Sequence, residues 1–183
     1  MINGINSREM ILEILLEIEE GEHSHVAIRN ALSKYQFLPK QDRAFITRVC
    51  EGTLEYRIQI DYIINSFSKV TVDKMKPAIR EILRSAVYQL KYMDSVPDHA
   101  VCSEAVKLAV RKGFSGLKGY VNGVLRSVAR GLDTLDYPQE GIEALSIQYS
   151  IPTWILRLWE KSYGEEVPRT MAADFLKERP VTI

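Results

Sequence analysis

Apolar residues recur at three- and four-residue spacing along most of the chain, and the pattern is clearest between residues 77 and 131. In the first part of this stretch, the apolar residues that would share one helical face are Ile79, Ile82, Leu83, Ala86, Val87 and Leu90. Val96-Pro97-Asp98 interrupts the pattern, because proline cannot continue a helical hydrogen-bond ladder but fits an opening turn. Two further periodic segments follow, with Leu108 in the first and Leu125 in the second. The stretch predicts three packed amphipathic helices around which the rest of the chain is built.

The residues before this stretch predict further helices. Asn6 can cap the first one, with Ile5 packing on Met10 at its entry. Gly21 ends that helix, and Ser24 can cap the next.

A long helical segment then runs from Lys40 to Phe67. Gly52-Thr53 lies inside it and marks either a helix end or a point of close packing.

Helical patterns resume after a polar, turn-prone link at residues 132–138 and a short helix through Leu145. Ser150 can cap the next helix, with Pro152 in its first turn. The side chains expected to face a core from this helix are Trp154, Ile155, Leu158 and Trp159. A last helix at residues 167–177 is expected to turn inward Met171, Ala172, Phe175 and Leu176.

The sequence therefore predicts an all-α fold: a helical bundle over residues 3–131, then a helical linker over residues 132–183 that begins another domain. Residues 178–183 support this division, because a proline followed by a β-branched run is typical of a starting strand. With 183 residues and 46% apolar content, the chain can bury a core without disulfides or metal. No apolar run is long enough to span a membrane, and the polar start lacks the order of a secretory signal. We expect a cytoplasmic protein with reduced cysteines.

Charge is distributed unevenly, although the formal net charge is zero. Residues 26–131 hold 18 basic and nine acidic side chains, and the two ends of the chain balance this excess. A basic zone of this kind suits phosphate binding, although helical bundles also carry many solvated lysines and arginines. The residues predicted to contact phosphates are Lys40, Arg43, Arg48, Arg57, Arg80, Arg84, Lys118, Arg126 and Arg130. Each could instead be a solvated side chain or part of a structural ion pair, and Arg84 and Arg126 lie beside core positions.

Motifs for catalysis are missing from the sequence. Neither a GxGxxG nor a GxxxxGK[ST] phosphate-binding loop occurs. Cys50 and Cys102 lack a neighbouring histidine that could activate them. His23 and His25 are two residues apart, where helical side chains diverge, so we expect no metal site. We predict no catalytic residue, and a helical binding module is the class that remains.

The run LRSAVYQLKYMDSVPDHAVCSEAVKLA, followed by GYVNGVLRSVAR, resembles the carboxyl half of the NusB-type helical RNA-binding fold. Asp42-Arg43, and Glu51-Gly52-Thr53 with Arg57, are similar to the middle helices of that fold. Arg126 departs from the free antitermination factor, which usually has an acidic residue there. The segment from Ser150 through Trp154 and Trp159 to Gly164 is instead similar to the S-x-P-x-W…W…Y-G segment of bacterial 16S ribosomal RNA cytosine-carbon-5 methyltransferases of the RsmB (Sun/Fmu) type.

This resemblance implies a noncatalytic N-terminal domain that places 16S ribosomal RNA for a downstream methyltransferase domain of the same enzyme. In that family, S-adenosylmethionine and a cysteine nucleophile belong to the downstream domain, whose Pro-Cys and Thr-Cys motifs are not found here. We therefore expect this chain alone neither to bind the cofactor nor to methylate. Two other hypotheses stay open: a free-standing NusB-like transcription antitermination factor, and a helical protein-interaction module. We further expect the basic residues to converge on one RNA-facing surface, which fixes orientation through phosphates.

Overall fold

The computed structural model describes residues 6–164 and 166–175, and all regular elements within them are helical. The first helices are α1 (Ser7–Glu19), α2 (Ser24–Lys34), α3 (Lys40–Glu55), α4 (Arg57–Phe67), α5 (Pro77–Tyr92), α6 (Asp98–Arg111) and α7 (Lys118–Gly131). They are followed by α8 (Gly141–Tyr149), α9 (Thr153–Tyr163) and α10 (Val167–Phe175). The prediction of an all-α fold is confirmed. The predictions for Ile5, Leu176 and residues 178–183 concern positions outside the described residues.

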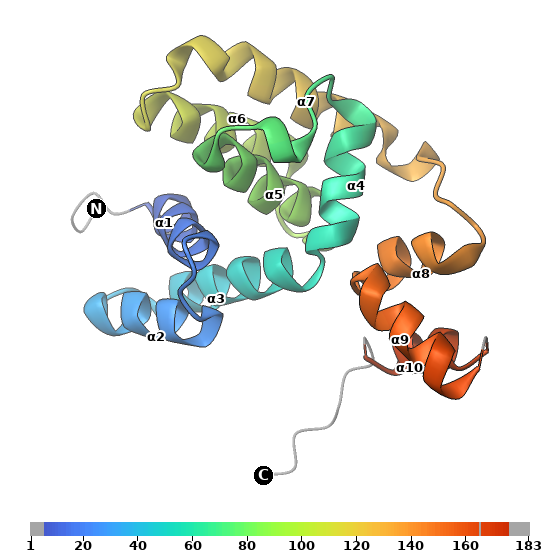
Figure 1. The fold of residues 1–183 in the computed structure, drawn as a ribbon. Coiled ribbons are helices and arrows are strands. Elements are labelled where there is room, and N and C mark those ends of the chain that lie inside the picture. The colour runs from blue at the N-terminus through green and yellow to red at the C-terminus, as the bar shows by residue number, and fades with distance from the viewer. Residues whose placement is uncertain (1–5, 165, 176–183) are drawn as a thin grey trace.

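Helix α5 is the centre of the bundle, and α1, α3, α4, α6 and α7 pack around it (Figure 1). Pro77 lies in its first turn. Proline has no backbone N–H, and an N–H at this position would have no acceptor within the helix, so no hydrogen bond is lost. Ile82, Leu83 and Val87 are almost completely buried, as the apolar spacing predicts. Because most helical stability comes from burying an apolar face, this stripe fixes the positions of the surrounding helices.

The three helices predicted between residues 77 and 131 are α5, α6 and α7. Pro97 immediately precedes α6, and Gly113, with a φ of 87°, turns the chain between α6 and α7. Helices α6 and α7 therefore form a hairpin that packs on α5. Leu125 of α7 is completely buried in the main core, as predicted.

Near the N-terminus, the predicted cap at Asn6 is present, because its Oδ1 accepts a hydrogen bond from the backbone N of Arg8 at 2.9 Å. Gly21 follows α1 with a φ of 113°, as expected of a helix end. The predicted cap at Ser24 is wrong: Ser24 is already inside α2, and the cap residue is His23, which makes no side-chain cap bond. The predicted segment from Lys40 to Phe67 is two helices, which meet at Tyr56.

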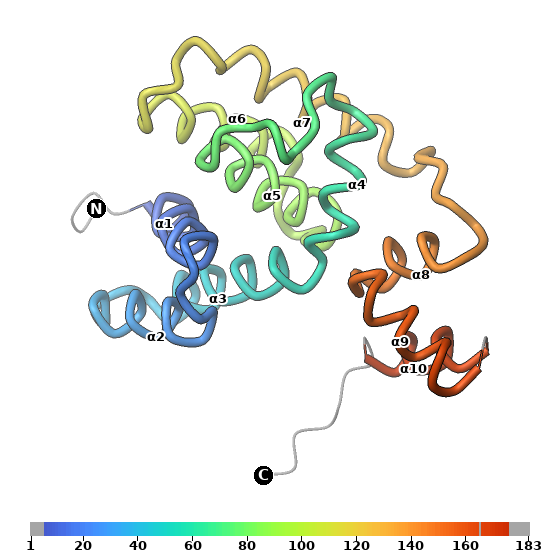
Figure 2. The backbone as a smooth tube through the Cα atoms, in the orientation of Figure 1, coloured from blue at the N-terminus to red at the C-terminus, as the bar shows by residue number. Residues whose placement is uncertain are grey.

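Helices α8, α9 and α10 form a smaller unit beside the bundle (Figure 2). The unit has its own cluster of buried residues, Ile151, Leu156 and Ala172. The unit contacts the bundle through α4 and α8. Gln59 Nε2 of α4 donates to the carbonyl oxygens of Ile147 and Gln148 at 3.2 and 3.3 Å. These bonds pair backbone groups at the end of α8, where a helix leaves carbonyls without partners.

The predicted roles of Ser150, Trp154 and Leu158 are wrong. Ser150 ends α8 in a left-handed conformation with a φ of 54°, and its Oγ accepts from the N of Ile58 at 2.9 Å. Trp154 and Leu158 are 65% and 52% exposed, whereas Leu156 occupies the buried position on α9. The apolar residues of α9 surround much of the helix, so packing against α8 and α10 selects the buried face.

Phe175 is also exposed, against the prediction that it turns inward, while Ala172 is buried as predicted. The ring of Phe175 instead stacks on Trp159, with 5.5 Å between their centroids. Among the described helices, none combines the length and apolar character that crossing a membrane requires.

Candidate nucleic-acid interface

The nine predicted RNA-contacting residues lie in three separate places. They are Lys40, Arg43 and Arg48 on α3; Arg57, Arg80 and Arg84 between α4 and α5; and Lys118, Arg126 and Arg130 on α7. Helix α5 packs against both α3 and α7 and lies between them (Figure 1). The prediction of a single basic surface is therefore wrong. The central helix separates basic residues that belong to one positively charged stretch of the sequence, residues 26–131.

Two residues of the α4–α5 group are engaged in structural ion pairs. Arg84 donates to both carboxylate oxygens of Asp61 at 2.7 Å and to Glu81 at 2.6 Å, with its side chain 11% exposed. Arg80 pairs with Glu19 of α1 and donates to the carbonyl oxygen of Val72 at 3.1 Å. Since the planar guanidinium has a fixed set of donors, these bonds leave little of either residue for phosphate.

The electrostatics of this cluster follow from its burial. Burial raises the pKa of Glu81, and the charge of Arg84 opposes that rise. For Arg84, burial favours loss of the proton, but bonds to Asp61 and Glu81 outweigh it and raise its pKa. Arg57 is exposed at the rim of the same hollow, together with the carboxylates of Asp61 and Asp73. A hollow in which acids balance the arginines is a poor site for a polyanion.

On α3, Lys40, Arg43 and Arg48 line an open hollow of about 550 Å³. Arg48 Nη2 donates to the carbonyl oxygen of Tyr92 at 3.3 Å, which ties this guanidinium to the end of α5. Glu51 and Glu55 line the other end of the hollow. The α3 hollow is thus basic at one end only.

The α6–α7 groove is the third place, with a volume of about 490 Å³. Its lining residues are Asp98, His99, Cys102, Ser103, Val106, Lys107, Asn122, Arg126, Ala129 and Arg130. Lys118, Asn122, Arg126 and Arg130 are successive positions four residues apart along α7. Such positions follow one side of a helix, so Asn122, Arg126 and Arg130 lie along the α7 side of the groove.

Three cations and one carboxylate, that of Asp98, line the α6–α7 groove. Lys107 donates to Glu104 at 2.8 Å, and this hydrogen bond lowers the pKa of the Glu104 carboxyl. The lysine side chain is 61% exposed, so the pair is a weak surface contact that a phosphate can replace. Arg126 and Arg130 are exposed. The groove therefore offers accessible positive charge beside polar groups, which suits a phosphate backbone with adjoining bases.

Lys107, His99 and Asn122 are groove residues that were absent from the sequence-based set. The i, i+4 pair Lys107 and Arg111 was a usable signal, because a short link before α7 implies a hairpin in which these helices face one another.

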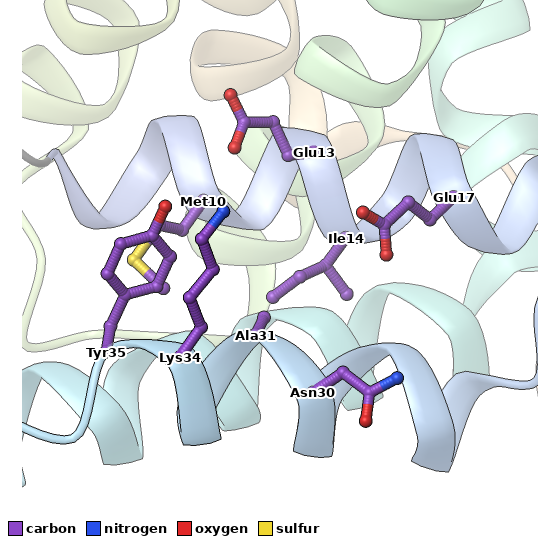
Figure 3. A pocket seen from close by; sticks show the side chains of 8 residues that line it. All are labelled: Met10, Glu13, Ile14, Glu17, Asn30, Ala31, Lys34 and Tyr35. Carbon is purple, nitrogen blue, oxygen red and sulfur yellow. The ribbon is translucent and has the colours of Figure 1, made fainter.

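A further hollow of about 150 Å³ lies between α1 and α2 (Figure 3). Glu13 and Glu17 of α1 line it opposite Lys34 and Tyr35, and the Lys34 ammonium lies 5.3 Å from the centroid of the Tyr35 ring. Two carboxylates at this small site disfavour a phosphate. It carries no RNA-binding role in our interpretation.

His99 and Cys102 lie three residues apart on α6 and line the same groove, so the prediction that Cys102 has no neighbouring histidine is wrong. Both thiols nevertheless lack the lowered pKa of a nucleophile. Burial raises the pKa of both thiols, with smaller contributions from Glu51 at Cys50 and Asp98 at Cys102. Arg126 opposes the rise at Cys102 without reversing it. Within the part of the chain that the structure describes, no three His, Cys, Asp or Glu side chains are grouped as metal ligands.

This helical architecture and basic groove define a helical binding domain of the NusB class, and residues 5–130 match the NusB family. The chain belongs to the NusB family.

Among curated proteins, the chain is 34% identical over 176 residues to the probable ribosomal RNA small subunit methyltransferase B of Synechocystis sp. (strain ATCC 27184 / PCC 6803 / Kazusa), covering 93% of this chain and 39% of that protein. The chain spans less than two fifths of the length of the curated relatives it matches.

Two solved structures share the fold. PH0851 matches 96% of this chain and 40% of its own length, with a TM-score of 0.75 and 19% identity. The antitermination factor NusB, solved with NusE and double-stranded RNA, matches 68% of this chain and 94% of its own length, with a TM-score of 0.63 and 19% identity. The PH0851 match therefore extends well beyond the share of the chain that the antitermination factor covers.

Proposed function

We propose that this chain is the RNA-positioning domain of an S-adenosylmethionine-dependent 16S ribosomal RNA 5-methylcytosine methyltransferase that acts in the cytoplasm. The observation that carries the proposal is the α6–α7 groove, where Lys107, Arg126 and Arg130 are accessible on a NusB-family bundle. The name of the Synechocystis relative, which aligns over 93% of the chain, supports the enzyme class.

In this proposal, the basic side chains of the groove bind phosphates and Asn122 and His99 contact the sugar or base edges beside them. Phosphate contacts fix the position of an RNA without reading much of its sequence. The role of the domain is to hold the ribosomal RNA so that a catalytic domain reaches one cytosine. Orientation of this kind lowers a reaction barrier, because the translational and rotational entropy of the reactants is lost on binding and not in the reaction step.

Within residues 6–164 and 166–175, the hollows and cysteines described above do not favour binding of the cofactor or the chemistry of methyl transfer. The hollows described above are lined by charged side chains on helices, and both cysteine thiols are buried with raised pKa values. We infer that S-adenosylmethionine binds elsewhere in the longer enzyme and that residues 1–183 alone do not methylate RNA.

The extent of the two structural matches weighs against a free-standing antitermination factor, because the NusB structure covers 68% of this chain and PH0851 covers 96%. A pure protein-interaction bundle is the other hypothesis. It predicts no affinity of the groove for RNA.

The deciding experiment titrates a 16S ribosomal RNA fragment into this chain at two salt concentrations. The wild type is compared with a groove variant, Arg126→Gln with Arg130→Gln, and a matched α3 variant, Lys40→Gln with Arg48→Gln. Each lost phosphate contact should reduce the slope of log affinity against log salt by about 0.7 to 0.9. We expect the groove variant to lose more affinity and slope than the α3 variant. Wild-type binding that is undetectable at low salt would exclude the RNA-positioning role.

A further inference from the structure

The exposed side of α9 has a composition unlike the rest of the described surface. Trp154, Arg157, Leu158 and Lys161 are spaced i, i+3, i+4 and i+7, so they form one stripe along the helix. All four are exposed, with Trp154 at 65% and Leu158 at 52%. We call these four residues the α9 stripe.

Large apolar side chains are exposed at seven of the described positions, and four of them lie in α9 and α10: Trp154, Leu158, Tyr163 and Phe175. The bundle, in contrast, buries its apolar residues around α5. Since single exposed apolar residues are ordinary, the relevant observation is this concentration on the smallest unit of the fold. Tryptophan and arginine are enriched among the residues that contribute most of the binding energy in protein interfaces.

The unit that carries the α9 stripe has a thin core of its own, in which Ile151, Leu156 and Ala172 pack together as one small buried cluster. Arg157 lies 3.7 Å from Glu143, and both side chains are about two-thirds exposed, so this contact is a weak surface pair. The stripe therefore has apolar area and exposed positive charge available for a partner.

The course of the chain indicates which partner is nearby. Helix α10 packs on α9, and Phe175, at the end of the described chain, stacks on Trp159 of α9. In the curated relatives and in PH0851, well over half of the polypeptide lies outside the region that matches this chain. A polypeptide that continues after α10 begins beside α9, which raises its effective concentration at the stripe.

We propose that the α9 stripe is the docking surface for the downstream domain of the same polypeptide, through an apolar hollow with an acidic rim. This inference rests on one part of the proposed function, namely that the chain belongs to a longer enzyme with a downstream domain. Trp154 and Leu158 fill the hollow, and Arg157 and Lys161 pair with the rim. The contact fixes the catalytic domain relative to the α6–α7 groove.

The test uses thiol labelling in the full-length protein and in residues 1–183. Leu158→Cys introduces a thiol at an exposed position, and Phe37→Cys, at 57% exposure in the loop before α3, is the matched control. Both native cysteines are buried, and peptide mass spectrometry separates each labelled site from the others. We expect position 158 to react severalfold more slowly with maleimide in the full-length protein than in the fragment. Position 37 should react equally in both.

A second variant tests the charge complementarity. Arg157→Glu with Lys161→Glu, added to Leu158→Cys in the full-length protein, should restore fast labelling at position 158 and leave the melting temperature of the fragment unchanged. Equal labelling of position 158 in the fragment and the full-length protein overturns the docking surface, while the RNA titration of the groove variants independently decides the proposed function.

Two other occupants give distinct results that also overturn the proposal. Protection that appears in the fragment with rising protein concentration identifies a second copy of the chain. Protection of the fragment by a 16S ribosomal RNA segment identifies RNA.

Discussion

Gly52 of α3 lies so close to the ring of Tyr88 of α5 that a Cβ atom at position 52 would overlap that ring. The absence of a side chain therefore sets how closely the two helices approach. Tyr88 also faces Tyr92, with 5.3 Å between ring centroids, and Tyr92 stacks on Tyr56 at 4.3 Å. One glycine thus positions a group of rings at the junction of α3, α4 and α5.

Gly52→Ala should destabilise the protein by about 1–3 kcal/mol, because an added methyl forces the Tyr88 ring or the helix to move. Chemical denaturation measures the change. Gly123→Ala is the matched control, since Gly123 also lies inside a helix but a Cβ there meets nothing within 4 Å. That substitution should stabilise by about 0.5–1 kcal/mol through helix propensity. If the two substitutions change the unfolding free energy equally, Gly52 does not lie against the ring of Tyr88.

Leu125→Ala should cost about 2–5 kcal/mol, because the completely buried side chain would leave a cavity between α7 and the bundle core. Val110→Ala is the exposed control, with 42% of the residue accessible, and should stay within about 0.5 kcal/mol. If Leu125→Ala lowers the unfolding free energy by less than about 0.5 kcal/mol in chemical denaturation, Leu125 is not buried in the core.

Arg84→Met should destabilise by about 3–5 kcal/mol, because it leaves the buried carboxylate of Glu81 without its partner. Adding Glu81→Gln should recover part of this loss, since the buried carboxylate is then removed and only that of Asp61, 23% exposed, has lost its arginine partner. The two single variants and the double variant form a thermodynamic cycle. Additive effects in that cycle would show that the ion pair contributes no coupling.

The raised pKa of Glu81 also predicts a pH dependence. The folded state keeps this proton to higher pH than the unfolded state does, so it binds more protons between the two pKa values. Stability from this group is therefore present below the unfolded pKa of about 4.3 and declines as pH rises through the folded pKa. Relative to Glu81→Gln, the wild type should lose unfolding free energy across that window and then reach a plateau. If the difference in unfolding free energy between the wild type and Glu81→Gln is constant with pH, the pKa of Glu81 is not raised.

Gln59→Leu should loosen the attachment of α8 to the bundle, because Gln59 Nε2 donates to two carbonyl oxygens at the end of α8 and its Oε1 accepts from the hydroxyl of Tyr92. Hydrogen exchange should become faster in residues 141–163 and stay unchanged in α6. Exchange that accelerates equally throughout the bundle would instead indicate a general loss of stability.

Local patterns were sufficient to predict the helices around the core. Periodic apolar residues and Pro97 placed α5, α6 and α7, because burial of a stripe and the geometry of proline act over a few residues. The same reasoning found the Asn6 cap and the helix end at Gly21. It misassigned Ser24 and Ser150, since a serine can cap a helix, lie inside one or accept a hydrogen bond from a distant backbone N–H.

The sequence by itself determined an all-helical NusB-family bundle organised around the three helices of residues 77–131, because apolar periodicity and breaker residues encode each helix locally. The tertiary structure alone decided which cations are accessible. Arg80 pairs with Glu19 and Arg84 pairs with Asp61 and Glu81, and these acids come from three different helices. It also decided that Trp154 faces outward, because the direction of a helical face depends on the helices packed against it. Charge pairing and the choice of buried face are long-range properties, which no local spacing specifies.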